Sequence, residues 1–307
     1  MRKLYAGVLI IAVCLIGNAA MADVMIFGGI PISKTGIKIT GWGSGSVFEA
    51  TDHVYTGDRC IKIRSEGYHE GGCITLKDPI DILSEPFDEN TYLFVPIYFT
   101  TPDNGSASSS GTGLMDTQTT VGPQNYYSNG QEFDAPVKPK VKAVKIMLEA
   151  ADGRKLESIQ NVPASTDDGW YRIAVPFKTL GFKKGESFKV SRVIISTDVP
   201  DTIFVGQIST TKDDTQITCN AGDDQVVAIN DVLMFHAQAE GGISQLQCSW
   251  NFGDRNKPDD PDGDDATGEL VSHRFTKAGD YTVRLTVSDL AGVKKPAVHT
   301  VIITVND

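Results

Sequence analysis

The sequence lacks long apolar runs beyond its first residues. The stretch 4–16 is apolar, two basic residues precede it, and the small-x-small triplet at 20–22 follows it. This arrangement is typical of a secretory signal peptide over residues 1–22. A membrane-spanning helix needs about 20 apolar residues, and no later run reaches that length. We therefore expect no membrane span in a secreted protein, extracellular or at the cell surface, with the periplasm as the alternative.

Basic residues are also scarce. The chain has 28 Lys and Arg against 39 Asp and Glu, a net charge of −11, and removal of the signal peptide makes it more negative by two. Nucleic-acid binding requires basic patches, so this balance argues against a nucleic-acid partner and against an anionic membrane surface. This negative charge is compatible with a secreted protein that is exposed to calcium.

The common catalytic motifs are missing. The sequence contains no G-x-S-x-G, H-E-x-x-H, P-loop or dinucleotide fingerprint, and the pair His69-Glu70 lacks the second histidine of a zinc protease. Glycoside hydrolysis needs two carboxylates across a cleft, and the sequence neither identifies nor excludes such a pair. We expect a protein that is not an enzyme, with a jelly-roll glycoside hydrolase or polysaccharide lyase as the alternative.

Cysteines are few, and none has the C-x-x-C spacing of a redox or zinc site. After the signal peptide they form two local couples in separate halves of the chain. Four cysteines allow three pairings, and in a secreted protein the local couples favour the disulfides Cys60–Cys73 and Cys219–Cys248.

Helical periodicity is nearly absent, because no stretch of about eleven residues keeps a convincing helical spacing of apolar residues. Short stretches that alternate or are rich in β-branched residues dominate instead, with turn-forming residues between them. They are 37–40, 60–64, 92–99, 141–149, 171–175, 190–196 and 203–208. Many short strands without helices predict an all-β protein of the sandwich type. The segment 100–140 breaks this pattern, and a loop of that length is either functional or disordered.

The C-terminal part carries a linked set of motifs. W-x-F-G-D at 250–254, H-x-F at 273–275 and G-x-Y-x-V-x-L-x-V-x-D at 279–289 occur in this order. They resemble the PKD (polycystic kidney disease) domain over about 217–307. The resemblance implies an immunoglobulin-like β-sandwich that is a non-catalytic spacer or interaction module, with the motif aromatics in its core.

The N-terminal part resembles the jelly-roll carbohydrate-binding modules of polysaccharide-degrading systems. The residues that carry this resemblance are YTGDRCIKIRSEGYHEGGCITL, DGWYRIAVPF and DTIFVGQI. It implies a jelly-roll β-sandwich. Many members hold a structural calcium with acidic residues in the last strand, where this chain has Gly206-Gln207. The sequence thus divides into a signal peptide (1–22), a jelly-roll-like domain (23–212) and a PKD domain (213–307).

Sugar binding needs exposed aromatic rings with polar side chains around them. The candidates are Trp42, Tyr68, Tyr126, Tyr127 and Trp170. Trp42 stands among glycines, where a backbone can approach a ligand closely. Trp170 opens an alternating strand and is favoured as a core residue. For Trp42 and Tyr68 a structural role competes with binding, whereas Tyr126 and Tyr127 belong either to a binding loop or to disordered chain.

An aspartate-rich stretch interrupts the PKD pattern. Its carboxylates alternate around a glycine, as calcium-binding loops require, and the stretch resembles the Asp-x-Asp-Gly-Asp core of thrombospondin type 3 repeats. The candidate ligands are Asp259, Asp260, Asp262, Asp264 and Asp265. A solvated turn is the alternative, and we expect a structural calcium because close carboxylates repel unless neutralised.

Together these features predict a secreted, non-catalytic glycan-binding or surface-adhesion protein. The expected partners are extracellular polysaccharides or cell-surface glycans and other surface proteins. A structural component of the cell envelope is the further alternative.

Overall fold

The computed structural model describes residues 24–83, 87, 89–100, 140–162, 169–182, 185–254 and 263–307, and the backbone of 126–128 and 131–133. In this part of the chain, regular structure is β apart from two 3-10 turns, η1 (Ile32–Lys34) and η2 (Phe177–Leu180). None of its helices is long and apolar enough to cross a membrane. The predicted all-β fold is confirmed, while the predicted signal peptide lies outside the described residues.

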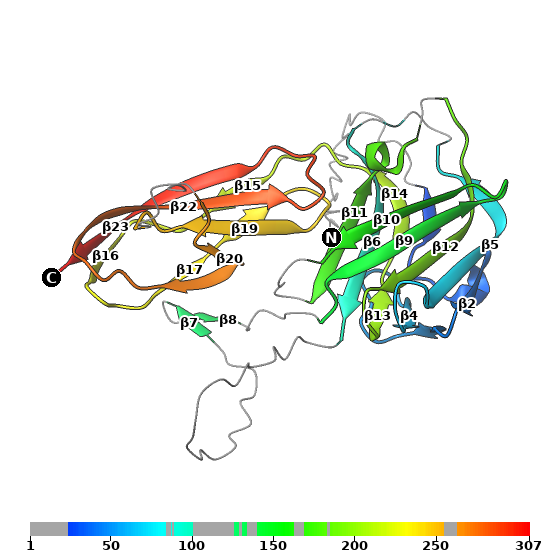
Figure 1. Ribbon diagram of the computed structural model, residues 1–307, viewed down its shortest axis with the longest axis horizontal. Coiled ribbons are helices and arrows are strands. Elements are labelled where there is room, and N and C mark those ends of the chain that lie inside the picture. The colour runs from blue at the N-terminus through cyan, green and yellow to red at the C-terminus, as the bar shows by residue number, and fades with distance from the viewer. Residues whose placement is uncertain are drawn as a thin grey trace, which may run out of the picture.

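The N-terminal domain is a sandwich of two antiparallel sheets, drawn at the right of Figure 1. Sheet A runs in the order β1, β14, β6, β13, β4, β3, and β11 pairs with the other edge of β6. Sheet B runs in the order β10, β9, β12, β5, β2. The bounds in sheet A are β1 (Met25–Phe27), β14 (Ile208–Lys212), β6 (Thr91–Phe99), β13 (Asp201–Val205), β4 (Cys60–Ser65), β3 (Ser46–Ala50) and β11 (Trp170–Pro176). Those in sheet B are β10 (Lys155–Asn161), β9 (Ala143–Ala150), β12 (Lys189–Thr197), β5 (Gly71–Asp81) and β2 (Ile37–Trp42).

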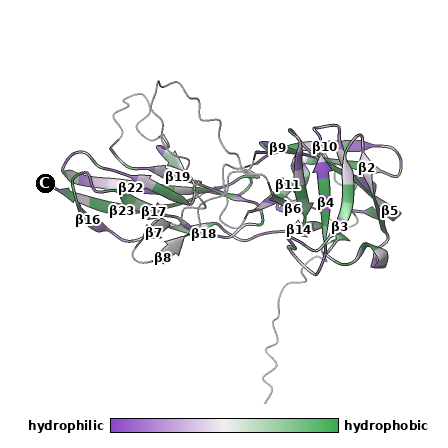
Figure 2. Ribbon diagram, turned by 90° about the horizontal axis from the view of Figure 1, so that it is seen from below, coloured by the Kyte–Doolittle hydropathy of each residue, from purple (hydrophilic) through white to green (hydrophobic). Residues whose placement is uncertain are grey.

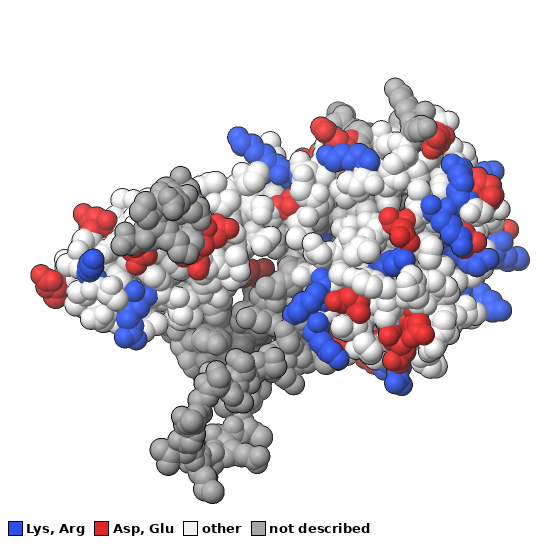
Figure 3. All heavy atoms as spheres, viewed as in Figure 1, with Lys and Arg blue, Asp and Glu red and all other residues white. Residues whose placement is uncertain are grey.

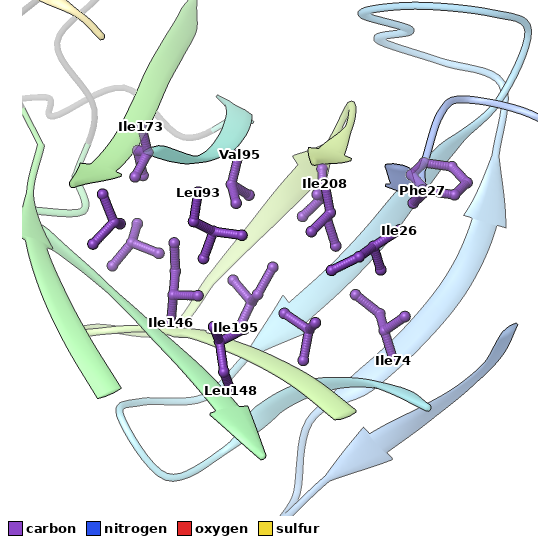
Figure 4. Packing of buried hydrophobic residues seen from close by; sticks show 14 of the residues in the cluster. Ile26, Phe27, Ile74, Leu93, Val95, Ile146, Leu148, Ile173, Ile195 and Ile208 are labelled. Atoms are coloured by element: carbon purple, nitrogen blue, oxygen red, sulfur yellow. The ribbon is translucent and has the colours of Figure 1, made fainter. Parts of the chain in front are cut away.

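Apolar side chains at alternate strand positions fill the space between these sheets. In Figure 4, Ile146 and Leu148 of β9 point toward Leu93 and Val95 of β6, and all four are buried. Successive side chains of a strand point to opposite faces. The residues between the core positions therefore lie on the outer faces of the two sheets, where a ligand can reach them.

The C-terminal domain is a second sandwich with its own core (Figure 1). Trp250, Phe252 and Phe275 are at most 2% exposed there, as the motifs predict. Hydrophobic residues lie along the strands of both domains (Figure 2). One sheet contains β16 (Gln225–Ala228), β23 (Ala297–Asn306), β22 (Gly279–Asp289), β19 (Leu246–Asn251) and β20 (Ala266–Thr267). Two strand pairs complete the sandwich: β17 (Leu233–His236) with β21 (Leu270–His273), and β15 (Thr218–Asn220) with β18 (Gln238–Glu240).

The two domains are joined by an interface on the outer face of sheet A. Tyr92, Phe94 and Ala174 form a buried cluster with Ile243 and Val293 of the C-terminal domain, among others. Two hydrogen bonds extend this contact. The Gln245 amide N–H donates to the Arg172 carbonyl (2.8 Å), and the Arg172 amide N–H donates to Gln245 Oε1 (3.4 Å).

The connecting segment is fixed by one buried lysine. Lys294 Nζ lies 2.9 Å from Asp213 Oδ2 and donates to the Thr215 carbonyl. The other Asp213 carboxylate oxygen accepts bonds from the amide and hydroxyl of Thr215. Burial alone would raise the pKa of Asp213, but its hydrogen bonds to Thr215 and Lys294 hold that pKa below its usual value.

Neither predicted disulfide is present, because all four cysteines are thiols. The Cys60–Cys73 prediction is wrong for a topological reason. Cys60 lies on β4 of sheet A and Cys73 on β5 of sheet B, and each side chain points away from the core. Packed sheets are about 10 Å apart, so residues on opposite outer faces cannot be bridged. Cys219 and Cys248 both contact the C-terminal core but are not bonded to each other.

Candidate functional site

The outer face of sheet B forms a surface of three rows across the five strands, which we call the Trp42 face. The first row is charged: Glu149 lies 3.8 Å from Lys155 Nζ and 3.5 Å from a guanidinium nitrogen of Arg192. The second is apolar at its centre, with Met147, Ile194 and Cys73 in register on adjacent strands. The third row ends at Trp42, on the edge strand β2.

Trp42 covers the centre of this face. Met147 and Ile194 point outward, yet they are only 8% and 4% exposed, because they form a cluster with Cys73 against which Trp42 packs. Trp42 is opposite Gly71 on β5. The indole itself is half-buried, so part of it faces solvent.

Glycines set the position of Trp42 by close backbone packing. A Cβ on Gly45 would lie 2.3 Å from the Gly71 carbonyl oxygen, and a Cβ on Gly41 would lie 2.2 Å from the Gly45 oxygen. These residues form the corner where the chain passes from sheet B to sheet A. These two glycines thus allow close packing of the chain's own backbone, and the approach of a ligand to them stays a prediction.

Polar side chains lie at the margin of the Trp42 face. Lys145 Nζ lies 2.9 Å from a Glu157 carboxylate oxygen, and the Ser44 hydroxyl donates to Glu70 Oε1 (3.1 Å). The exposed His69 ring stands edge-on to Trp42, with centroids 6.3 Å apart. The face thus combines an apolar floor with donors and acceptors at its margin.

Tyr68 is brought to the same end of the sandwich. It lies in the crossing from β4 to β5, where its carbonyl accepts a hydrogen bond from the Ser196 hydroxyl (2.9 Å). The structure therefore places two predicted residues, Trp42 and Tyr68, in one region. Tyr126 and Tyr127 lie on β7 (Tyr126–Ser128), which pairs with β8 (Gln131–Phe133), and their side chains lie outside the described residues.

Trp170 lies on the opposite side of the sandwich, on the outer face of sheet A. It is in register with Tyr98 on β6 and contacts Tyr55, with ring centroids 5.6 Å and 5.0 Å away. It is half-buried by these rings, so the prediction of a core residue is wrong for the inter-sheet core. Its neighbours come from parts of the chain far from it in sequence.

The carboxylates on the Trp42 face are suited to binding. Glu149 and Glu157 are each paired with a cation, Glu149 with Arg192 and Glu157 with Lys145. Charged groups of both signs at fixed positions make strong hydrogen bonds to hydroxyl groups. On the face of the molecule shown in Figure 3, acidic and basic side chains are interspersed over the N-terminal domain.

The aspartate-rich loop is described only at its C-terminal end. Asp265 Oδ2 accepts the Phe252 amide N–H (2.8 Å), and Asp254 pairs with His273 Nε2 (2.9 Å). The described residues contain no cluster of three or more His, Cys, Asp or Glu that suits a metal. Asp259, Asp260 and Asp262 lie outside them, so calcium binding stays a prediction.

Comparison with known proteins identifies the C-terminal domain. Residues 217–305 match the family model described as the PKD domain, which confirms the resemblance seen in the sequence motifs. No curated protein matches the chain.

Three solved structures are similar to parts of the chain. The PKD domain of human KIAA0319 is 20% identical over 30% of this chain and 81% of that chain, with a TM-score of 0.23. A β-1,2-glucanase from Parabacteroides distasonis is 10% identical over 94% of this chain, which spans 38% of the glucanase, with a TM-score of 0.34. The CBM22-1 xylan-binding domain of Paenibacillus barcinonensis Xyn10C is 12% identical over 63% of this chain and 97% of that domain, with a TM-score of 0.31.

Proposed function

We propose that the protein is a secreted, non-catalytic glycan-binding protein that holds a polysaccharide on the Trp42 face. The observation that carries this proposal is the half-buried indole of Trp42, which lies over an apolar floor and is bordered by fixed polar groups. A pyranose ring has an apolar C–H face and a hydroxyl periphery, so it fits this arrangement of ring and margin.

The location of the face supports the same proposal. The C-terminal domain packs on the outer face of sheet A, through Tyr92, Phe94 and Ala174. The Trp42 face is on the other sheet, so among the described residues the C-terminal domain leaves it accessible to a long polymer. In this proposal the PKD domain is a spacer or interaction module that has a fixed orientation relative to the binding face.

The ion pairs favour binding over catalysis. A glycosidase needs one carboxyl group with a raised pKa as the acid and a second carboxylate across the bond. On the Trp42 face, Glu157 is instead paired with Lys145 and Glu149 with Arg192, so each of these carboxylates is engaged by a cation. We therefore propose that bound glycans are retained and not cleaved.

Binding to immobilised polysaccharides, followed by calorimetry, tests the proposal. Wild-type protein is applied to xylan, β-glucan, galactomannan and polygalacturonate. The variant Trp42→Leu keeps an apolar cover over Met147 but removes the flat ring, and we expect about 10- to 100-fold weaker binding. Trp42→Phe keeps a ring and is expected to bind within a few-fold of wild type.

The control is Ile302→Ala, which removes an exposed side chain from the C-terminal domain. Equal binding by Trp42→Leu and this control would refute the role of the Trp42 face. Release of reducing ends from any of the polysaccharides would contradict the non-catalytic part of the proposal.

A further inference from the structure

A row of side chains crosses the outer face of sheet A from Trp170 to Phe48. The strand registers place the following residues side by side: Trp170 on β11, Tyr98 on β6, Phe204 on β13, Lys62 on β4 and Phe48 on β3. Four of the five are aromatic, although this face lies outside the core between the sheets.

The segment between β3 and β4 covers the middle of this row. His53 stacks on Tyr98 with ring centroids 4.0 Å apart and meets Phe204 edge-on at 4.8 Å. As a result Phe204 is only 2% exposed. His53 has a φ of +52°, which is uncommon for a residue with a side chain, so the stacking holds the segment in one conformation.

The Phe48 end of the row is open. Phe48 is 57% exposed, and it borders a pocket with a volume of about 420 Å³, within the usual range of small-molecule sites of about 300–1,000 Å³. We call this the Phe48 pocket. It is lined by Phe48, Glu49, Ala50, Thr51, Asp52, Arg59 and Lys62.

The charged groups of the Phe48 pocket are held in place. Arg59 Nε lies 3.0 Å from Glu49 Oε1, and a guanidinium nitrogen lies 3.5 Å from Asp58. The other Glu49 oxygen accepts the Ile32 amide N–H (2.6 Å). Lys62 Nζ lies 5.2 Å from the centroid of the Phe204 ring. Because these positions are fixed before a ligand arrives, binding requires little further ordering of the pocket.

The lining chemistry selects a class of ligand. Two carboxylates and two cations line the Phe48 pocket, so a ligand with a net charge of either sign meets repulsion as well as attraction. A sugar hydroxyl donates and accepts hydrogen bonds, so it can use both kinds of group. The exposed Phe48 ring offers a flat surface for a pyranose C–H face.

We propose that the Phe48 pocket is a second carbohydrate-binding site, for a neutral glycan. It lies on the opposite outer face from Trp42, with the whole sandwich between them, so two separate stretches of polysaccharide occupy the two sites. The protein then joins polysaccharide chains, and both contacts together bind more tightly than either alone. The joining of chains rests on the function proposed for the Trp42 face, whereas the pocket itself does not.

Calorimetric titration with cellohexaose, xylohexaose, mannohexaose and laminarihexaose tests the pocket. Wild-type protein is expected to bind two hexaose molecules per chain. Phe48→Ala is expected to leave binding at the Trp42 face unchanged and to weaken binding at the Phe48 pocket about 10- to 100-fold. Phe48 is exposed, so this variant should keep its melting temperature. Lys62→Met keeps the Phe48 ring but removes a charged group, and it is also expected to weaken binding at the Phe48 pocket. Ile302→Ala is the control.

The outcomes separate the two proposals. If Phe48→Ala keeps the stoichiometry and affinity of wild type, the Phe48 pocket is refuted. If in that case Trp42→Leu weakens hexaose binding, the result supports the Trp42 face. If Phe48→Ala abolishes binding and Trp42→Leu does not, the pocket is supported and the Trp42 face is refuted. Wild-type protein that binds none of the hexaoses overturns the pocket.

Discussion

At the scale of single residues, Cys60 shows how position on a strand determines chemistry. Its Sγ donates to the Asp52 carbonyl (2.8 Å), and it is fully buried beneath the segment that carries His53. Burial and the nearby charge of Asp52 raise the pKa of the Cys60 thiol to about 11. A thiolate is the reactive form, so Cys60 is unreactive at neutral pH.

We predict that iodoacetamide at pH 8 leaves Cys60 unmodified in the folded protein and modifies it fully after unfolding without reductant. Peptide mass spectrometry measures both states. The same digestion tests the topology, because a Cys60–Cys73 linked peptide from the native protein would contradict the placement of these residues on opposite outer faces.

At the scale of elements, the corner between β2 and β3 determines whether the binding face forms. Gly45 packs directly on Gly71, so a side chain at position 45 forces the corner away from β5 and moves Trp42 with it. Overpacking of this kind typically costs about 1–3 kcal/mol. The glycine-rich sequence therefore serves the placement of the aromatic ring.

We predict that Gly45→Ala lowers the free energy of unfolding by about 1–3 kcal/mol and weakens glycan binding. Gly36→Ala is the matched control, because a Cβ there has no heavy atom within 4 Å. Chemical denaturation measures the difference. If both variants unfold at the same denaturant concentration, the corner tolerates a side chain and this account of it is wrong.

Sequence reasoning predicted strands better than their partners. The W-x-F-G-D motif, through its resemblance to the PKD domain, implied that Trp250 and Phe252 lie in a core, and both are buried in the structure, because such a motif is a local property of the sequence. The register that places Trp170 beside Tyr98 joins residues far apart in the chain, and no local pattern specifies it. The predicted Cys60–Cys73 disulfide was wrong for a similar reason: the two residues are close in sequence, but the chain changes sheets between them.

At the scale of the whole molecule, the interface fixes the two domains relative to each other. The Asp213–Lys294 pair is central to it, since both side chains are less than 10% exposed. The folded-state pKa of Asp213 lies below its ordinary value of 3.8. Its stabilising effect is therefore present above that pH and is lost as the pH falls through the lower, folded-state pKa.

We predict that Lys294→Met destabilises the protein by about 3 kcal/mol, because it leaves the Asp213 carboxylate buried beside an apolar side chain. The double variant Asp213→Asn with Lys294→Met is expected to recover part of this loss. Thermal unfolding measures the stability, and small-angle scattering measures the domain arrangement. The neighbouring Lys295→Met is the control, and equal melting temperatures for the two lysine variants would contradict a structural role for the pair.

The central claim is that Trp42 contacts the glycan, and the indole N–H signals in a nitrogen-15 NMR titration test it most directly. The chain has three tryptophans. Trp250 is buried, and its Nε1–H donates to the Gly268 carbonyl (3.0 Å), so its signal is an internal reference. On addition of the hexaose that binds most tightly, the account predicts that the Trp42 signal shifts and the Trp250 signal does not. A Trp42 signal that stays in place while the hexaose binds would contradict it.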